Sequence, residues 1–529
     1  MSTQATRNAA SPSGDSPAAT ERAETAKSAR SGAIGLVGAA VNGLLGFVLA
    51  IVITRGFGSV GAGAFFSAIG LVTIATAICT LGAETGMVWA LPRRRRGVEG
   101  DAAQIMPVAL TPPLVASVLL ALGGVLAVDW LAPRLLDSAG SAGPALLAVS
   151  FAALPMVVLM NLLLAALRCV RPIGTYVAIQ SLWLPIGRPL LVGGAALLGG
   201  GVVLGMTGWL LPAGVALLAC AVLVSRSLAI GRGARLHPAR GDWPWFWSFA
   251  LPRAASAAID AGSMWIGVLM TAALASQAEA GIFGAVGRYV LAGQLALQGL
   301  RVAISPQLSR LLATGRRAEA AQVHRQMTTW AMVLSLPVYV LLAVFSLGFL
   351  QLFGPEFTAG SAAMTVLAIA MVVNISVGNV QSLLLMAGRS GLHLMATLAN
   401  VVANLTLGIA LIPAHGAIGA AIAWSTGIVV ENVLAAIAAW RVVGHPLLTV
   451  GMLRTAGAVI GGVGALSTLA VIIAGRGVIG LGVALVTVAL ASVSYLTIPS
   501  GRRQVWDILK KIRDGRQDGG RLHSGTSGG

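Results

Sequence analysis

The stretch that decides the fold reads RSGAIGLVGAAVNGLLGFVLAIVITRGFGSVGAGAFFSAIGLV and covers residues 30–72. It contains an apolar run over 31–54, a glycine-rich turn that begins at Arg55, and the start of a second apolar run over 62–91. A helix of about 20 apolar residues crosses the roughly 30 Å hydrocarbon core of a bilayer, because its backbone hydrogen bonds are closed inside the helix. Each run is therefore predicted to be a transmembrane helix.

The same pattern recurs along the rest of the chain, and fourteen such runs can be counted. Their approximate bounds are 31–54, 62–91, 104–127, 144–167, 173–199, 201–225, 248–274, 279–304, 328–350, 361–386, 393–413, 417–440, 455–474 and 479–499. The sequence therefore predicts an all-α integral membrane protein with about 14 transmembrane helices.

The composition excludes an ordinary soluble protein. Hydrophobic residues make up 57 % and charged residues 10 % of the 529 positions, and the mean hydropathy is +0.87, whereas soluble domains carry about 25 % charged residues. The net charge of +18 would suit a nucleic-acid binder only in a soluble chain. The basic residues stand in clusters between apolar runs, which is typical of loops that contact an anionic inner leaflet. We therefore expect membrane lipids as partners and no nucleic acid.

Neither a cofactor nor a metal ion is expected. The three cysteines, Cys79, Cys169 and Cys220, have no CxxC or His-paired spacing, and the six histidines are scattered over loops and the ends of runs. This pattern is not typical of a zinc site or a disulfide framework.

The distribution of basic residues predicts the topology. With fourteen spans and the N-terminus inside, 28 of the 35 Lys and Arg residues fall on the cytoplasmic side, and only Arg55, Arg134 and Arg476 fall outside. This asymmetry is a strong positive-inside signal, so both termini are expected in the cytoplasm. Arginine outnumbers lysine by far, and Ala, Gly and Val are abundant, as in GC-rich bacteria. We therefore expect the bacterial plasma membrane.

Six regions are predicted along the chain. They are a disordered cytoplasmic tail (1–30), a first six-helix bundle (31–225), a cytoplasmic linker with an aromatic interfacial segment (226–247), a second six-helix bundle (248–440), helices 13 and 14 (455–499) and a basic cytoplasmic tail (500–529). The last tail is either a short amphipathic helix on the inner leaflet, with Val505, Ile508, Leu509 and Ile512 at helical spacing, or a solvated segment.

A short internal repeat relates the two bundles. Gly61-Ala62-Gly63-Ala64-Phe65 opens the second run, and Glu279-Ala280-Gly281-Ile282-Phe283 opens the eighth, 218 residues later. Both copies follow an outward span and begin an inward one, which predicts two parallel six-helix repeats around a central cavity, plus two C-terminal helices. Such an arrangement would suit alternating access.

Three stretches resemble the polysaccharide transporters (oligosaccharide flippases) of the multidrug/oligosaccharidyl-lipid/polysaccharide (MOP) superfamily. They are residues 30–72, FALPRAASAAIDAGSMWIGVLMTAALASQAEAGIFGAVGRYV at 249–290, and RVAISPQLSRLLATGR at 301–316. The resemblance covers roughly residues 30–500. It implies translocation of a polyprenyl-pyrophosphate-linked oligosaccharide from the cytoplasmic to the outer leaflet for cell-surface polysaccharide biosynthesis. Polysaccharide synthesis and export proteins are candidate partners on the same ground.

Ionisable residues inside the apolar runs are functional candidates, because a charge at the bilayer centre costs several kcal/mol. Arg188 lies in the fifth run between Pro185 and Pro189, which interrupt the backbone hydrogen bonds. Arg253 and Asp260 are seven residues apart on the seventh run and share one helix face.

The eighth run carries Arg288 and then Gln294, Gln298 and Arg301, the last three forming a polar stripe at spacings of four and three. Arginine stays charged and can hold phosphate oxygens with two N–H groups. We therefore expect a cavity site in which arginines bind the pyrophosphate and polar side chains line the wall. The cations are Arg188, Arg288, Arg253 and Arg301, and the polar lining is Gln294, Gln298 and Asn42.

Each of these residues also has a structural interpretation. Arg253 and Arg301 could snorkel to the cytoplasmic interface, and either Arg188 or Arg288 could pair with Asp260 inside the protein. Asp260 is interpreted as a counter-ion, the alternative being a carboxylate that couples transport to protons or sodium. The amides in other spans, such as Asn161, Gln180, Asn374, Gln381, Asn400 and Asn404, are interpreted as interhelical hydrogen-bonding groups rather than sugar ligands.

The sequence thus favours a flippase for a lipid-linked oligosaccharide, with no covalent chemistry and hence no enzyme activity. The alternatives are a cation-coupled multidrug or small-molecule antiporter and a peptidoglycan lipid-precursor flippase, both of the same fold. An integral membrane glycosyltransferase ranks last, because such enzymes usually carry a large outer loop and no outer loop here exceeds about twenty residues.

Overall fold

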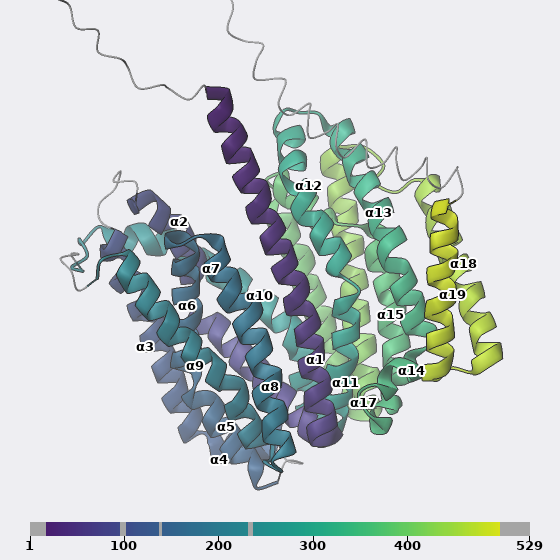
Figure 1. Ribbon diagram of the computed structural model, residues 1–529, viewed down its shortest axis with the longest axis horizontal. Helices are drawn as coiled ribbons and strands as arrows, with labels where there is room; N and C mark the ends of the chain where they lie inside the picture. Colours follow the sequence, from purple (N-terminus) through teal and green to yellow (C-terminus); the bar gives the residue numbers. More distant parts are fainter. Residues whose placement is uncertain (1–16, 96–101, 137–139, 231–235, 498–529) are drawn as a thin grey trace, which may run out of the picture. The chain divides into compact units, whose positions relative to one another are not determined.

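The computed structural model describes residues 17–95, 102–136, 140–230 and 236–497. In this part of the chain every regular element is a helix and there is no strand. The residues separate into two compact units (Figure 1). Unit 1 comprises the residues up to Val52, Ala68–Ala132 and Ser141–Met264, and unit 2 comprises Ile53–Ser67, Pro133–Gly140 and the residues from Trp265 onward.

Unit 1 contains the helices of the first half of the chain. They are most of α1 (Pro17–Cys79), α2 (Ala83–Arg95), η1 (Ala102–Gln104), α3 (Ile105–Leu126), α4 (Val128–Leu135) as far as Ala132, α5 (Ala142–Ala152), α6 (Leu154–Val170), α7 (Ile173–Val177), the π-helical η3 (Ala178–Trp183), α8 (Leu184–Leu197), α9 (Val202–Ser227) and α10 (Asp242–Leu274) as far as Met264. Helix α6 packs against α2, α3 and α9, and α8 packs against α9.

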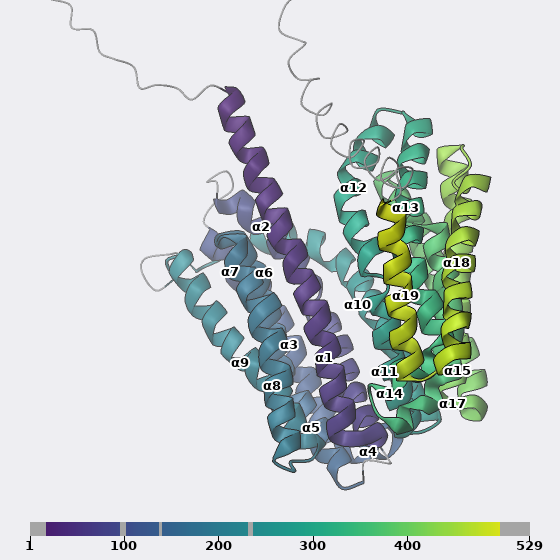
Figure 2. The same ribbon diagram turned by 45° about the vertical axis from the view of Figure 1, so that its right-hand side comes forward.

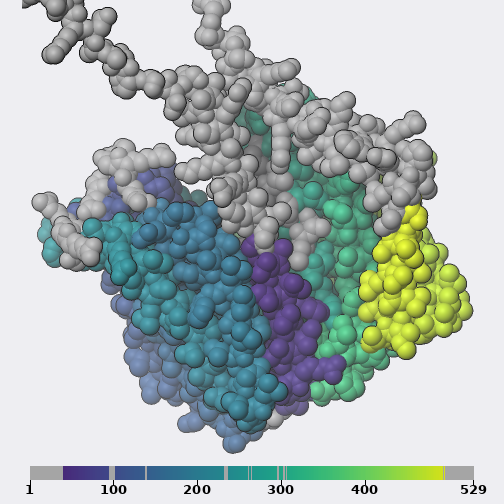
Figure 3. All heavy atoms as spheres, in the orientation of Figure 1, coloured from purple at the N-terminus to yellow at the C-terminus, as the bar shows by residue number. Residues whose placement is uncertain are grey.

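Unit 2 contains the remaining helices. They are the end of α10, α11 (Gln277–Ala292), α12 (Leu295–Ala313), α13 (Arg317–Val344), α14 (Ser346–Gln351), η4 (Pro355–Gly360), α15 (Ser361–Val377), α16 (Val380–Met386), α17 (Ser390–Val443), α18 (Val450–Ala474) and α19 (Val478–Thr497). Helix α13 packs between α15 and α18, and α19 packs on α18 (Figure 2). In the space-filling view α18 and α19 form one edge of this unit (Figure 3).

The described helices are long and apolar enough for a membrane protein. Eight of them pass as single spans by length and composition, or nine if the two parts of α10 are taken as one span. Two of the eight, α1 and α17, are each long enough to hold two spans, and each breaks at a glycine with non-helical backbone angles. Gly58 (φ 67°) and Gly416 (φ 52°) are those breaks, and they fall in the predicted gaps between runs. The predicted all-α membrane fold class is confirmed.

At each break, a glutamate carboxylate of unit 2 accepts hydrogen bonds from the residue that follows the glycine. The Glu356 carboxylate accepts hydrogen bonds from the Ser59 N–H and the Ser59 hydroxyl, each at 2.8 Å. The Glu279 carboxylate accepts from the Ala417 N–H at 2.7 Å. A carboxylate at a helix N-terminus accepts from a backbone N–H that has no partner within the helix, and its charge complements the helix dipole. The same chemistry therefore fixes the start of the helix after each break.

The boundaries of the predicted regions are corrected in three places. Residues 17–30, predicted to be disordered, belong to α1, because their alanines, glutamates and arginines favour helix. The aromatic segment of the predicted linker lies inside α10, and Phe246 is fully buried. Unit 2 takes residues 53–67 from the predicted first bundle, and unit 1 takes residues 248–264 from the second. The predicted basic tail (500–529) lies outside the described residues.

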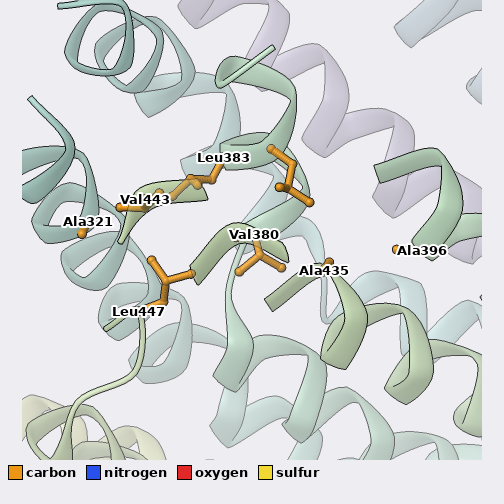
Figure 4. Close-up of a cluster of buried hydrophobic side chains, with 9 residues drawn as sticks. Ala321, Val380, Leu383, Ala396, Ala435, Val443 and Leu447 are labelled. Carbon is orange, nitrogen blue, oxygen red and sulfur yellow. The ribbon is translucent and has the colours of Figure 1, made fainter. Parts of the chain in front are cut away.

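The core of unit 2 includes a cluster of nine buried apolar residues (Figure 4). They come from α13, α16, both arms of α17 and the turn after it: Ala321, Val380, Leu383, Leu384, Ala396, Ala435, Ala439, Val443 and Leu447. Alanines at the facing positions of the two arms let the backbones approach closely, which is the usual way in which membrane helices pack.

Candidate functional site

Arg188 is held inside unit 1 by an aromatic ring. It lies on α8 between Pro185 and Pro189, and its guanidinium carbon is 4.2 Å from the ring centroid of Trp209 on α9. Its Nε is buried and has no hydrogen-bond partner among the described residues. Because Pro189 has no N–H, the carbonyl of Pro185 also lacks its helical partner. The fifth span therefore carries a cation whose N–H groups are not used by any described carboxylate.

Arg288 occupies a similar setting in unit 2. It lies on α11, and its guanidinium carbon is 4.7 Å from the Trp265 ring centroid and 5.4 Å from that of Phe66. Gly284, one turn earlier, allows this approach, because a Cβ there would stand 2.6 Å from the Phe66 ring. None of the ion pairs between described residues includes Arg288. Cation–π contacts orient a guanidinium without neutralising it.

Arg253 and Arg301 differ from these two, because both are exposed. Arg253 turns back on its own helix: it donates to the Phe249 carbonyl at 3.1 Å and stacks 3.8 Å from the Phe249 ring centroid. Arg301 lies on α12. The interpretation that these two arginines sit at an interface stays a prediction.

The predicted polar stripe, Gln294, Gln298 and Arg301, lies on α12, with Gln294 as the N-cap and the Gln298 N–H donating to the Gln294 carbonyl at 3.0 Å. A break separates this stripe from Arg288 on α11. Helix α11 ends at Ala292 and α12 begins at Leu295, so Gln294 lies at the break, where its Nε2 is 3.3 Å from the Met371 sulfur. A Cβ at Gly293 would stand 2.6 Å from the Tyr339 ring, and this close packing coincides with the break. Gln298 is exposed on α12.

The eight predicted site residues divide evenly between the units. Asn42, Arg188, Arg253 and Asp260 belong to unit 1, and Arg288, Gln294, Gln298 and Arg301 belong to unit 2. Asn42 is exposed on α1, and the side chain of Asp260 lies outside the described residues. The roles assigned to all eight stay predictions.

Unit 1 contains a polar pocket that the sequence did not single out. Its volume is about 300 Å³, which is room for several water molecules. The polar pocket is lined by Glu84, Thr85 and Val88 of α2, Asn161, Leu164, Ala165 and Arg168 of α6, Tyr176 of α7 and Gln180 of η3. The guanidinium of Arg168 lies 5.8 Å from the Tyr176 ring centroid. The pocket thus presents a carboxylate, two amides, a phenol and a guanidinium, groups that bind sugar hydroxyls and phosphate oxygens.

Local backbone features place these groups. The chain turns at Leu81 and Gly82, both with positive φ, and Glu84 follows in the first turn of α2, where the helix dipole favours a carboxylate. A Cβ at Gly82 would stand 2.2 Å from the Ala250 carbonyl, so the turn requires glycine. Gln180 lies in a π-helical segment, a distortion that is frequent at functional sites.

A cluster of polar side chains in unit 2 is joined by hydrogen bonds between its members. Glu431 accepts from Asn400 Nδ2 at 2.7 Å and from the Thr397 hydroxyl at 3.2 Å. Asn432 Nδ2 donates to Asn374 Oδ1 at 2.9 Å. This amide cluster joins α15 to the two arms of α17, as expected for interhelical hydrogen bonds at Asn374 and Asn400.

Comparison by sequence finds one partial similarity and no match to a family model. The chain is 29 % identical over 175 residues to a Haloferax volcanii protein named "Probable low-salt glycan biosynthesis flippase Agl15". The match covers 32 % of this chain and 36 % of that protein, so it spans about a third of the relative's length.

Comparison by structure covers most of the chain. The lipid II flippase MurJ in an inward closed conformation superposes with a TM-score of 0.67 at 12 % identity, over 87 % of this chain and 99 % of MurJ. An inward-facing multidrug resistance MATE family transporter of the MOP superfamily gives a TM-score of 0.60 at 14 % identity, over 78 % of this chain and 96 % of that one. The chain therefore shares its fold with these two proteins, which agrees with the fold that its sequence resemblance implied.

Proposed function

We propose that the protein is a flippase that moves a polyprenyl-pyrophosphate-linked oligosaccharide from the cytoplasmic to the outer leaflet by alternating access. The observation that carries the proposal is that Arg188 on α8 and Arg288 on α11, in two of the predicted apolar runs, are each held by aromatic rings without a carboxylate partner among the described residues. The partial similarity to a probable glycan biosynthesis flippase supports the same substrate class.

The chemistry of the pair fits a pyrophosphate. A doubly charged head group leaves water during translocation, and an arginine that is already desolvated against an aromatic ring replaces part of its hydration. Because no described carboxylate neutralises Arg188 or Arg288, their N–H groups are available for phosphate oxygens. Charge-assisted hydrogen bonds of this kind are about twice as strong as neutral ones.

The polar pocket of unit 1 is assigned to the glycan. Glu84, Asn161 and Gln180 supply acceptors and donors for hydroxyl groups, and Tyr176 offers an aromatic face. Sugars are recognised by such convergent polar groups on an otherwise apolar wall.

We place the protein in the bacterial inner membrane with both termini in the cytoplasm, because of its positive-inside asymmetry. Its partners are then the lipid-linked oligosaccharide, the anionic inner leaflet and the polysaccharide synthesis and export proteins. No covalent chemistry is required of any residue.

One observation favours a second candidate, a cation-coupled antiporter. Glu84 is a carboxylate in a membrane-embedded pocket, and such residues bind protons or cations in transporters. Arg168 in the same pocket weakens this alternative, since a fixed cation repels a cationic substrate. A peptidoglycan lipid-precursor flippase is the nearer alternative, because its substrate is also a lipid-linked glycan.

The test is flipping of a fluorescent polyprenyl-pyrophosphate oligosaccharide in proteoliposomes by the parent, Arg188→Ala, Arg288→Ala and Arg454→Ala. We expect each of the first two substitutions to reduce the rate at least tenfold in protein that keeps its thermal midpoint, whereas Arg454→Ala, at an exposed position of α18 outside the candidate site, stays within about twofold. Full activity of both Arg188→Ala and Arg288→Ala would contradict the assignment of the pair.

A further inference from the structure

Unit 2 carries a groove of about 660 Å³ with three arginines at its rim, which the proposed function does not use. We call it the basic groove. Its arginines are Arg317, Arg389 and Arg441, and its wall is apolar, with Leu392 and Met395 from the first arm of α17 and Ile437 from the second.

The fold of α17 brings the arginines to one end of the helix pair. The helix turns back at Gly416, so its first residue, Ser390, and its last, Val443, lie at the same end. Arg389 precedes the first arm and Arg441 stands near the end of the second. Trp440, beside Arg441, is 53 % exposed, as tryptophan is at the membrane interface.

The three charges are not compensated inside the groove. All the residues that line it are apolar or arginine, and no described carboxylate pairs with any of the three. The neighbouring Arg316, by contrast, is neutralised by Glu319 through two contacts of 2.6 Å. The rim is thus complementary to an anion, while the wall is complementary to a hydrocarbon chain.

The depth of the wall matches one leaflet. The lining residues run from Arg389, just before the first arm, to Ala399 within it, a rise of ten positions or about 15 Å along a helix. This length is half of the roughly 30 Å hydrocarbon core. Met395, in the middle of the wall, is 68 % exposed, so the apolar surface is uncovered in the protein.

We propose that the basic groove binds an anionic phospholipid of the bilayer, with its phosphate at the three arginines and one acyl chain along the wall between the arms of α17. Basic pockets between transmembrane helices on the cytoplasmic side recognise such head groups. The site is separate from the candidate transport residues and does not depend on which substrate the protein carries.

The test measures the lipid that the purified full-length protein retains. The protein is reconstituted in vesicles of phosphatidylglycerol and phosphatidylcholine, extracted, and weighed with its bound lipid by native mass spectrometry. We expect the parent to retain phosphatidylglycerol preferentially. Because each arginine near an anionic head group contributes about 1 kcal/mol, the triple variant Arg317→Gln, Arg389→Gln, Arg441→Gln should weaken binding on the order of a hundredfold.

Two further variants keep the outcome interpretable. Arg454→Gln removes one exposed charge of α18 outside the groove and should leave retention unchanged. Ile437→Gln, at an exposed wall position, should reduce retention without changing the charge. The proposal is overturned if the triple variant retains phosphatidylglycerol like the parent, or if a polyprenyl diphosphate added to the same vesicles displaces it from the parent.

Discussion

Glu84 in unit 1 and Glu431 in unit 2 are both carboxylates inside apolar runs, yet their surroundings differ. Glu431 accepts hydrogen bonds from Asn400 and Thr397, side chains of the opposite arm of α17. Glu84 lines a pocket of about 300 Å³ with Arg168 and Gln180. The same residue type is therefore used in one unit to join helices and is left open in the other.

The difference shows what separates a structural polar group from a binding group in a membrane protein. A polar side chain in a span needs a partner, because hydrocarbon offers none. When neighbouring helices supply the partner, as in the amide cluster, the group stabilises the fold. When the partners surround a cavity instead, a ligand can complete the hydrogen bonding. The polar pocket is thus the better candidate for substrate contact.

The largest expected effect comes from reversing one charge in the polar pocket. Arg168→Glu puts a second carboxylate into the pocket of Glu84 and removes the guanidinium donors available to the glycan, and hydrogen bonds to charged groups are worth about 1.5–3 kcal/mol each. We expect flipping of the pyrophosphate-linked probe to fall on the order of a hundredfold. Arg171→Glu, which changes a nearby exposed residue outside the pocket, is the matched control and should leave the flipping rate nearly unchanged. An equal loss of flipping in both variants would mean that the charge of the protein surface, and not that of the pocket, determines the rate.

A smaller effect is expected from removing the negative charge of Glu84. Glu84→Gln keeps the shape but weakens a hydrogen bond to a charged group, which is worth about 1.5–3 kcal/mol. Flipping should fall about tenfold, while Glu431→Gln, in the amide cluster, stays within about twofold per folded molecule. Equal flipping by the two variants would erase the proposed distinction between the two glutamates.

A substitution in the amide cluster is expected to lower the free energy of unfolding of the protein. Asn400→Leu leaves Glu431 without its 2.7 Å donor and should lower the free energy of unfolding by about 1–2 kcal/mol. The measurement is unfolding by SDS titration, with Asn42→Leu at an exposed position as the control. If Asn400→Leu abolished flipping at unchanged stability, the cluster would be a binding site after all.

The smallest effect is expected at the edge of the cluster. Thr397→Val preserves the side-chain shape and removes only the 3.2 Å bond to Glu431. Interhelical hydrogen bonds in membranes average about 0.6 kcal/mol, so the free energy of unfolding should fall by about that amount. A loss larger than that of Asn400→Leu would reverse the order of the two contacts.

The helices could be predicted because hydrophobic length is a local property. The gaps predicted after residue 54 and before residue 417 contain the breaks at Gly58 and Gly416. The break between α11 and α12 could not be predicted in this way; it coincides with the approach of the Tyr339 ring to Gly293, which is a contact between two helices. The eighth predicted run is therefore two helices, with Arg288 on α11 and the stripe Gln294, Gln298 and Arg301 on α12.

The candidate site was predictable only in part. Arg188 and Arg288 stand out in the sequence as charges in apolar runs, but their aromatic partners come from other helices. Glu84, Asn161 and Gln180 were visible as polar residues within runs, without any sign that they meet. Their convergence depends on how α2, α6 and η3 pack, which the spacing along one helix does not encode.

The most direct measurement is the binding preference of the purified protein for two probes, a polyprenyl-pyrophosphate oligosaccharide and the same glycan on an uncharged polyprenyl carrier. We predict that the parent prefers the pyrophosphate probe at least tenfold and that the double variant Arg188→Gln, Arg288→Gln loses this preference while it still folds. An undiminished preference in the double variant would contradict the role proposed for the two aromatic-held arginines.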